Sequence, residues 1–168
     1  MSDANVATEK FGLVPPDVAA SMSGLELLQG MIAGRFPGPP IMQLIGFCLV
    51  EVENGRAVFA GTPAFAHYNP LGTVHGGYAA TLLDSCMGCS VHTTLPKGTG
   101  YTTLEFKISL VRAITADTGA VRAEGKVISS GRRVATAEGR LTDAGGRLLA
   151  HATTTCLVIG PSSEGSAP

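Results

Sequence analysis

One long helical segment stands among segments of alternating polarity, and this combination restricts the fold more than any other feature of the chain. The pattern predicts a helix over residues 76–92. The segments 101–112, 119–129, 132–142 and 147–159 alternate apolar with polar residues, as strands with one buried face do. Strands of this kind favour an antiparallel sheet. The sequence therefore predicts an α+β fold in which the long helix packs against a curved antiparallel sheet.

The alternation is clearest in the first of these strands. Its apolar positions are Leu104, Phe106, Ile108 and Leu110, and polar residues stand between them. Because successive side chains of a strand point to opposite faces, we expect these four residues to form the buried face of the strand.

The chain before the long helix is predicted to contribute a short helix and a hairpin. Ser23 can cap a helix over residues 24–33, because a serine hydroxyl accepts hydrogen bonds from the first turn of a helix. Residues 43–53 and 56–62 are predicted to be two strands that turn at an Asn-Gly pair, which is a strong turn signal. We expect this hairpin to join the sheet.

The chain of 168 residues is long enough for one domain with a hydrophobic core. Residues 1–20 are expected to be a flexible N-terminal arm and residues 161–168 a disordered tail, because both lack a regular apolar pattern. Residues 21–160 are expected to form the single domain, and no internal repeat divides it.

Composition excludes several classes of partner. Charged residues make up 15% of the chain and the net charge is −1, which gives no electrostatic case for binding nucleic acid or an anionic membrane. No apolar run approaches the roughly 20 residues that span a bilayer. The four cysteines stand in apolar contexts, as reduced thiols do. We therefore expect a cytoplasmic protein.

The stretch from Asn69 to Asp84 carries the strongest functional signal. His75, Gly76 and Gly77 stand where the long helix should begin, and a helix N-terminus offers free N–H groups and a partial positive charge to an oxyanion. Asp84 stands on an otherwise apolar face of the same helix, and burying a carboxylate is costly unless it has a partner or a task. The combination indicates acyl chemistry.

The spacing of this stretch predicts a site shared by two subunits. Gly76 and Asp84 are eight residues apart, so they lie about 12 Å apart along the axis of one helix. A catalytic carboxylate must come within roughly 3 Å of the group it activates. Two such helices packed antiparallel would bring the N-terminus of one toward the acid of the other.

These residues resemble a known family. Asn69, Gly72 and His75-Gly76-Gly77, followed by an acid nine positions after the histidine, resemble the hotdog-fold acyl-CoA thioesterases of the 4-hydroxybenzoyl-CoA and phenylacetic-acid-degradation type. The similarity covers roughly residues 40–158. It implies a long central helix wrapped by a curved antiparallel sheet, a homodimer with joined sheets, and dimers that pair into a homotetramer.

The resemblance also implies roles in hydrolysing an acyl-CoA thioester. The Gly76 N–H would polarise the thioester carbonyl, and Asp84 of the other subunit would act as nucleophile or as general base for water. Asn69 would place the carbonyl or the water, and His75 would support the loop and the thioester. Thr103 matches a position that orients the attacking water.

Other residues are expected to bind the substrate. Gly77 and Tyr78 adjoin the helix N-terminus, and Tyr78, Leu82 and the segment 36–48 are candidates to line the acyl pocket. Candidates for holding the CoA arm are Arg132 and Arg133, with Lys107 a weaker one. No cofactor is expected, because CoA is part of the substrate, and the preferred acyl group stays open.

Three alternatives accompany this interpretation. A hotdog hydratase or dehydratase acts on the acyl chain, and a non-catalytic hotdog protein only binds acyl-CoA. Cys86, Cys89 and His92 have a spacing that allows a zinc site on one helix, but they lack a fourth ligand and stand among apolar neighbours. No metal is therefore expected.

Overall fold

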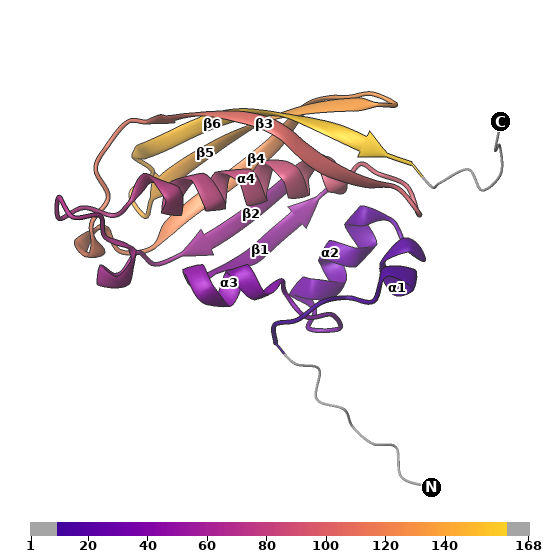
Figure 1. Ribbon diagram of the computed structural model, residues 1–168, viewed down its shortest axis with the longest axis horizontal. Coiled ribbons are helices and arrows are strands. Elements are labelled where there is room, and N and C mark those ends of the chain that lie inside the picture. Colours follow the sequence, from indigo (N-terminus) through magenta and orange to yellow (C-terminus); the bar gives the residue numbers. More distant parts are fainter. Residues whose placement is uncertain (1–9, 161–168) are drawn as a thin grey trace, which may run out of the picture.

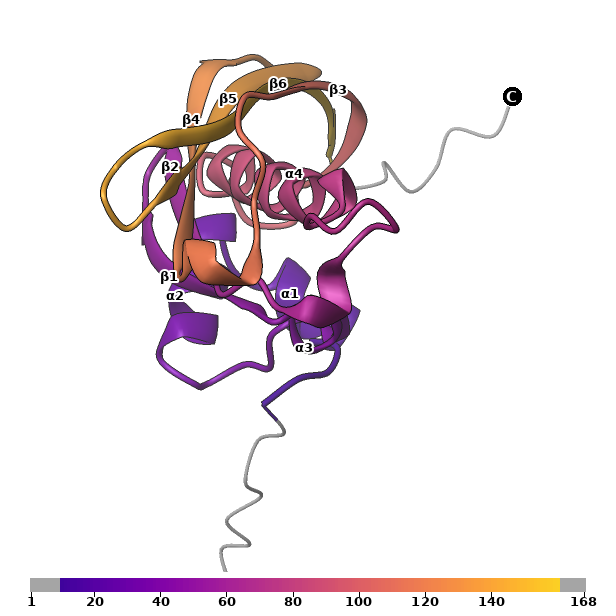
Figure 2. The same ribbon diagram turned by 90° about the vertical axis from the view of Figure 1, so that its left-hand side faces the viewer.

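A six-stranded antiparallel sheet wraps around one long helix in the computed structural model, which describes residues 10–160 (Figure 1). The order of the strands is β1-β2-β4-β5-β6-β3, so β1 and β3 form the two edges. Viewed from the end, the sheet curves around helix α4, Gly76–His92 (Figure 2). The strands are β1 Phe47–Glu53, β2 Arg56–Gly61, β3 Gly100–Leu110, β4 Val121–Ser130, β5 Val134–Asp143 and β6 Leu148–Ile159.

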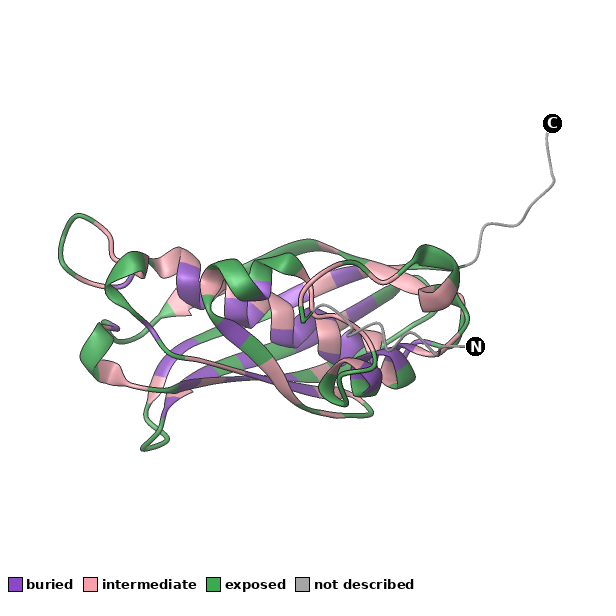
Figure 3. Cartoon of the chain, turned by 90° about the horizontal axis from the view of Figure 1, so that it is seen from below, coloured by how far each residue is buried: buried purple, intermediate pink, exposed green. Residues whose placement is uncertain are grey.

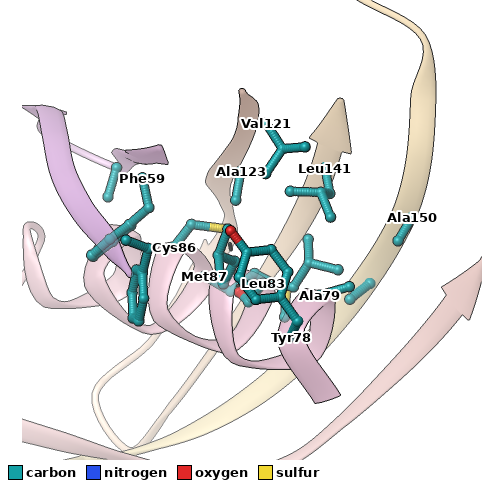
Figure 4. Packing of buried hydrophobic residues seen from close by; sticks show 14 of the residues in the cluster. Phe59, Tyr78, Ala79, Leu83, Cys86, Met87, Val121, Ala123, Leu141 and Ala150 are labelled. Carbon is teal, nitrogen blue, oxygen red and sulfur yellow. Dashed lines mark hydrogen bonds between the residues drawn. The ribbon is translucent and has the colours of Figure 1, made fainter. Parts of the chain in front are cut away.

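Helix α4 forms one side of the hydrophobic core. Leu82, Leu83 and Met87 are fully buried on it. Figure 4 shows Leu83 and Met87 among inward-facing residues of β2, β4 and β5. Gly125 of β4 permits this close approach, because a Cβ placed there would collide with the carbonyl oxygen of Cys86. The expected α+β fold, with a long helix against a curved antiparallel sheet, is confirmed.

Three short helices precede the sheet and lie on the side of α4 away from β5 and β6 (Figures 1 and 2). They are α1 Pro16–Ala20, α2 Gly24–Ile32 and α3 Pro40–Ile45. As predicted, Ser23 caps α2, and Glu26 completes a capping box with it. Two 3-10 turns, Phe65–His67 and Ala116–Thr118, complete the element list for residues 10–160.

The prediction of a strand from residue 43 was wrong at its start, because α3 occupies Pro40–Ile45 and β1 begins at Phe47. Pro40 stands at the first position of the helix, where its missing N–H costs nothing and its fixed φ suits the helix. Gly46, with φ of 72°, ends α3 in the left-handed conformation. The apolar residues that follow Pro40 are compatible with a short helix as well as with a strand.

The expected arm is only partly within the described residues. Residues 10–20 follow a defined path, in which Phe11 bridges to Gly38 and α1 begins at Pro16, so this part is not a loose arm. Residues 1–9 and the expected tail, 161–168, lie outside the described residues.

Strand β3 differs most from its expected burial. Leu104 and Leu110 are 57% and 58% exposed, and Phe106 is 36% exposed, although these residues were expected on a buried face. The cause is the position of β3 at the edge of the sheet, where it pairs with β6 alone. A bulge at Leu104 also interrupts the alternation.

Burial elsewhere follows the predicted alternation. In β5, Ala135, Ala137 and Leu141 are fully buried, whereas Thr136, Glu138 and Arg140 are more exposed. Figure 3 shows buried and exposed residues along the strands and the long helix. Among the helices of residues 10–160, none is both long and apolar enough to span a membrane.

Candidate active site

The loop before α4 is organised by one side chain. Asn69 Oδ1 accepts hydrogen bonds from the N–H groups of Leu71 and Thr73, at 2.9 and 3.4 Å, and Asn69 Nδ2 donates to the hydroxyl of Thr73 at 3.0 Å. This is an Asx-type turn, in which the asparagine stabilises its own loop. The loop in turn places His75 and Gly76 at the start of α4.

The N-terminus of α4 leaves one of its first amides free. His75 is the N-cap, and its Nδ1 accepts a hydrogen bond from the N–H of Gly77 at 2.8 Å. Within residues 10–160, the N–H of Gly76 has no acceptor. Gly76 is therefore the amide that can bind an oxyanion, whereas the N–H of Gly77, expected to contact substrate, is occupied by the cap.

A cavity of about 230 Å³ opens at this N-terminus. Gly76 and Asn69 line it together with the end of β3 and the loop that follows it. Arg112 contributes the one positively charged side chain among the lining residues. Arg112 was not predicted from the sequence, because only the path of the chain after β3 brings it to the helix start.

Asp84 and Thr103 contact each other away from the Gly76 cavity. The Thr103 hydroxyl donates to Asp84 Oδ1 at 3.0 Å, from β3 to the middle of α4. Both side chains are half-buried. The structure thus brings together the two residues that the family pattern pairs, and it leaves Asp84 Oδ2 without a hydrogen bond from any described residue.

Asp84 and Thr103 line a second, mostly apolar cavity of about 260 Å³. Burial raises the pKa of the Cys89 thiol to about 12 and lowers the pKa of His92, so both side chains are neutral at pH 7. Asp84 is the one charged side chain in the lining. Ser85 of α4 and Tyr101 of β3 also line it, and the other lining residues come from the chain before α4: Leu27, Leu28, Met31, Pro39, Ile41, Met42, Phe47 and Phe59.

The apolar walls were predicted only in part. Pro39, Ile41 and Met42 belong to the segment 36–48 that was expected to line an acyl pocket, and they do line this cavity. The contribution of α2 was missed, because nothing local tells which distant element its apolar face will meet.

Tyr78 and Leu82 do not line either cavity, contrary to expectation. Both are buried in the core, at 4% and 0% exposure. Figure 4 shows the Tyr78 ring among the core side chains, and its centroid lies 4.6 Å from that of His67. They face the sheet because their positions on α4 differ from the face that carries Asp84.

The candidate CoA-binding arginines lie at the far end of α4. Arg132 and Arg133 are exposed in the turn between β4 and β5. The adjoining Ser130 hydroxyl is 3.0 Å from that of Thr94, just past the end of the helix. Helix α4 has 17 residues, so this turn lies about 25 Å from Gly76 of the same chain. Lys107 is exposed on β3.

The cysteine and histidine positions on α4 have ordinary structural surroundings. Cys86 is fully buried, and its thiol donates to the carbonyl of Leu83. The ring of His92 packs against that of Tyr101, with centroids 5.4 Å apart. Within residues 10–160, no three histidine, cysteine or acidic side chains are grouped closely enough to hold a metal ion.

The two half-sites are separate within one chain. No residue lines both the Gly76 cavity and the Asp84 cavity. Strand β3 connects them, because Thr103 contacts Asp84 near one end and Leu110 lies against Gly76 at the other. One chain therefore carries the free Gly76 amide and the Asp84–Thr103 pair in two separate cavities.

Comparison with known proteins identifies the family. The thioesterase superfamily model matches residues 71–150. A phenylacetic acid degradation-related protein from Ralstonia eutropha JMP134 has 30% identity and a TM-score of 0.70, and the match covers 77% of this chain and 98% of that one. No curated protein matches the chain in a sequence search.

Two further structures extend the comparison. A variant of the phenylacetic acid degradation protein from Thermus thermophilus has 28% identity and a TM-score of 0.64, over 70% of this chain and 97% of that one. A Streptococcus mutans UA159 protein bound to acetyl CoA has 26% identity and a TM-score of 0.63, over 69% and 90%. With its wrapped helix and its match to the superfamily model, the chain belongs to the thioesterase superfamily and is a thioester hydrolase of the hotdog fold.

Proposed function

We propose that the protein hydrolyses acyl-CoA thioesters at two equivalent sites, each built from two copies of the chain. The observation that carries this proposal is the placement of the unbonded Gly76 amide and the Asp84–Thr103 pair in separate cavities at opposite ends of one open strand edge. Each copy supplies the half that the other lacks.

The exposed edge of β3 supports the assembly. A strand edge with free backbone groups and exposed apolar side chains is a template for pairing with another strand. A two-fold axis near Phe106, in the middle of β3, would lay two such strands antiparallel. The Gly76 end of one copy would then lie beside the Asp84 end of the other. The same pairing would cover Leu104 and Leu110, which one chain leaves exposed.

The proposed reaction assigns a step to each group. Asp84 accepts a proton from a water molecule, whose oxygen forms a bond to the thioester carbon. The carbonyl electron pair moves onto oxygen, and the resulting oxyanion is stabilised by the Gly76 N–H of the partner subunit and by the positive end of α4. Collapse of this intermediate breaks the C–S bond. The thiolate of CoA takes up the proton, and a carboxylic acid and free CoA leave.

Thr103 positions Asp84 in this scheme. Its hydrogen bond holds Oδ1, so that Oδ2 is left to face the substrate. Oδ2 could instead attack the carbonyl itself and form an anhydride that water then hydrolyses. A single turnover in ¹⁸O-labelled water distinguishes the two courses, because label enters Asp84 only through the anhydride.

The proposed dimer also suggests where the CoA arm of the substrate binds. In an antiparallel pair, Arg132 and Arg133 of one copy lie toward the Gly76 end of the other, where the CoA arm would emerge. We propose that these arginines bind the phosphates of CoA. We also propose that two dimers pair into a tetramer. The protein is further proposed to act in the cytoplasm, where its four cysteines would stay reduced. The reaction needs no cofactor, because CoA arrives with the substrate.

Release of free thiol from a panel of acyl-CoAs tests the proposed function. Asp84→Asn is expected to reduce turnover about 10²- to 10⁴-fold, the usual contribution of a general base. Ile128→Ala, which changes an exposed residue of β4 that lines neither cavity, should stay within about threefold of the unmodified protein. Absence of thiol release from any acetyl, octanoyl, palmitoyl or phenylacetyl thioester would refute the proposal. Hydration of an enoyl-CoA without thiol release would indicate a hydratase.

A further inference from the structure

We infer that Met31 and Met42 form a partition that closes the acyl pocket and sets the largest acyl group the enzyme accepts. This inference rests on the proposed function, because it takes the Asp84 cavity as the acyl pocket. It assigns the specificity of the site to two residues of the N-terminal helices. Both precede residue 71, where the match to the superfamily model begins.

The two methionines lie between two cavities. They line the 260 Å³ cavity that contains Asp84, and they also line a neighbouring cavity of about 370 Å³. The neighbouring cavity lies at the C-terminal end of α2, and its side-chain lining is mostly apolar, with Phe11, Ile32, Phe36 and Leu49 beside the methionines and Lys10 as its one charged residue.

The partition and Asp84 belong to different walls of the cavity. Asp84 and Thr103 belong to the wall that α4 and β3 provide, whereas Met31 and Met42 belong to the wall that α2 and α3 provide. An acyl group with its carbonyl carbon at Asp84 extends away from α4, and it therefore reaches the methionines with its distal end.

The volume of the Asp84 cavity suits a small acyl group. A water molecule occupies about 30 Å³ of liquid, so 260 Å³ holds roughly nine atoms of similar size. A phenylacetyl or octanoyl group is close to that limit, and a palmitoyl group exceeds it. Joining the neighbouring cavity would more than double the space and would admit the longer chain.

The surrounding structure fixes where the methionines stand. The capping box at Ser23 holds the start of α2, and the Gly24 N–H donates to the carbonyl of Leu95, beyond the end of α4. Met42 is 7% exposed and packs against Gly38, where an added Cβ would lie 2.9 Å from its sulfur. The unbranched thioethers can fill this irregular gap and separate the two cavities.

The acyl-chain preference of partition variants tests the inference. We measure kcat/KM of Met31→Ala, Met42→Ala and the double variant on acetyl-, octanoyl-, phenylacetyl- and palmitoyl-CoA. The unmodified protein is expected to prefer octanoyl or phenylacetyl over palmitoyl thioesters by at least about tenfold, and the double variant to gain about tenfold on palmitoyl-CoA with the other substrates little changed. Met31→Leu, which keeps the volume, and Leu44→Ala, which changes an exposed residue that lines neither cavity, should keep the original preference.

Two results would overturn the partition. One is that the unmodified protein hydrolyses palmitoyl-CoA with the same kcat/KM as octanoyl-CoA. The other is a uniform loss of kcat/KM on all substrates in folded alanine variants. Melting curves by circular dichroism check folding, and Met31→Val with Met42→Val replaces the alanine pair if it does not fold. If no thioester is hydrolysed at all, the proposed function fails, and calorimetric binding of acetic, octanoic, phenylacetic and palmitic acids still tests whether the methionines limit length.

Discussion

Thr103 of the edge strand donates a hydrogen bond to Asp84 Oδ1 of the central helix at 3.0 Å. This bond joins a residue of the candidate site to the strand that, in the proposed dimer, pairs with a second copy. Formation of the dimer and orientation of the carboxylate therefore depend on the same strand, β3.

Removing this hydrogen bond should affect turnover more than binding. Thr103→Ala is expected to lower kcat about tenfold with a small change in KM, because the carboxylate loses its orientation but keeps its charge. Thr103→Ser keeps the hydroxyl and should restore most of the rate. Steady-state kinetics on octanoyl-CoA measure both, and an equal loss in the two variants would show that the methyl group, rather than the hydrogen bond, matters.

The cap at the start of α4 predicts a graded effect at His75. Its Nδ1 accepts from the Gly77 N–H, so His75→Ala removes the N-cap and should cost about 1 kcal/mol of unfolding free energy. His75→Asn supplies another capping acceptor and should recover that stability. Urea unfolding gives the stabilities. If His75→Asn is as stable as the unmodified protein but lacks thioesterase activity, the imidazole itself contacts the substrate.

The edge of β3 should be the dimer interface. Phe106→Lys places a charge in the middle of that edge, and it is expected to give a folded monomer with little thioesterase activity. Ile128→Lys, at a position on β4 that is 59% exposed, serves as the matched control and should stay dimeric. Sedimentation velocity measures the size. A Phe106→Lys protein that remains a fully active dimer would place the interface elsewhere.

An ion pair away from the site predicts the acid stability of the fold. The Arg56 guanidinium, 2.9 Å from Glu124, and the nearby Lys126 lower the pKa of Glu124 to about 2. A folded-state pKa below the unfolded value of 4.5 gives stability that is present above pH 4.5 and is lost as the pH falls toward 2. Because the Glu124 side chain is 29% exposed, solvent screening limits this contribution to about 1–2 kcal/mol.

Comparing Glu124→Gln with the unmodified protein measures this contribution. The variant should be less stable by that amount at pH 7, and the difference should disappear near pH 2. Urea unfolding across this range gives the two curves. A difference that stays constant with pH would mean that the effect does not come from the charge of Glu124.

Local signals allowed the sequence to predict much of this structure. Ser23 and His75 are N-cap residues whose hydrogen-bond partners, the N–H groups of Glu26 and Gly77, lie within three residues, and both helices begin where expected. The alternation in β5 identified its buried face correctly. In each case the interaction that decides the structure is recorded in neighbouring residues.

The misses depend on contacts between distant segments. Leu104 and Leu110 alternate as a buried face, but one chain has nothing to cover them. Met31 reaches the Asp84 cavity only because α2 packs against β1 and α4, and no residue near Met31 in the sequence predicts that packing. Tyr78 adjoins the motif in sequence, yet the pitch of the helix turns it into the core.

A mixing experiment tests the shared site most directly. Gly76→Pro removes the N–H of a first helical position, where the proline backbone is well tolerated and the flexible end of the Leu110 side chain must move aside for the ring, and Asp84→Asn removes the carboxylate. Each variant alone is expected to be nearly inactive. Refolding the two together should restore roughly a quarter of the original activity, because half of the dimers are mixed and each mixed dimer has one site with both intact groups. If the mixture stays as inactive as its components, Gly76 and Asp84 do not act across two subunits, and the account is wrong.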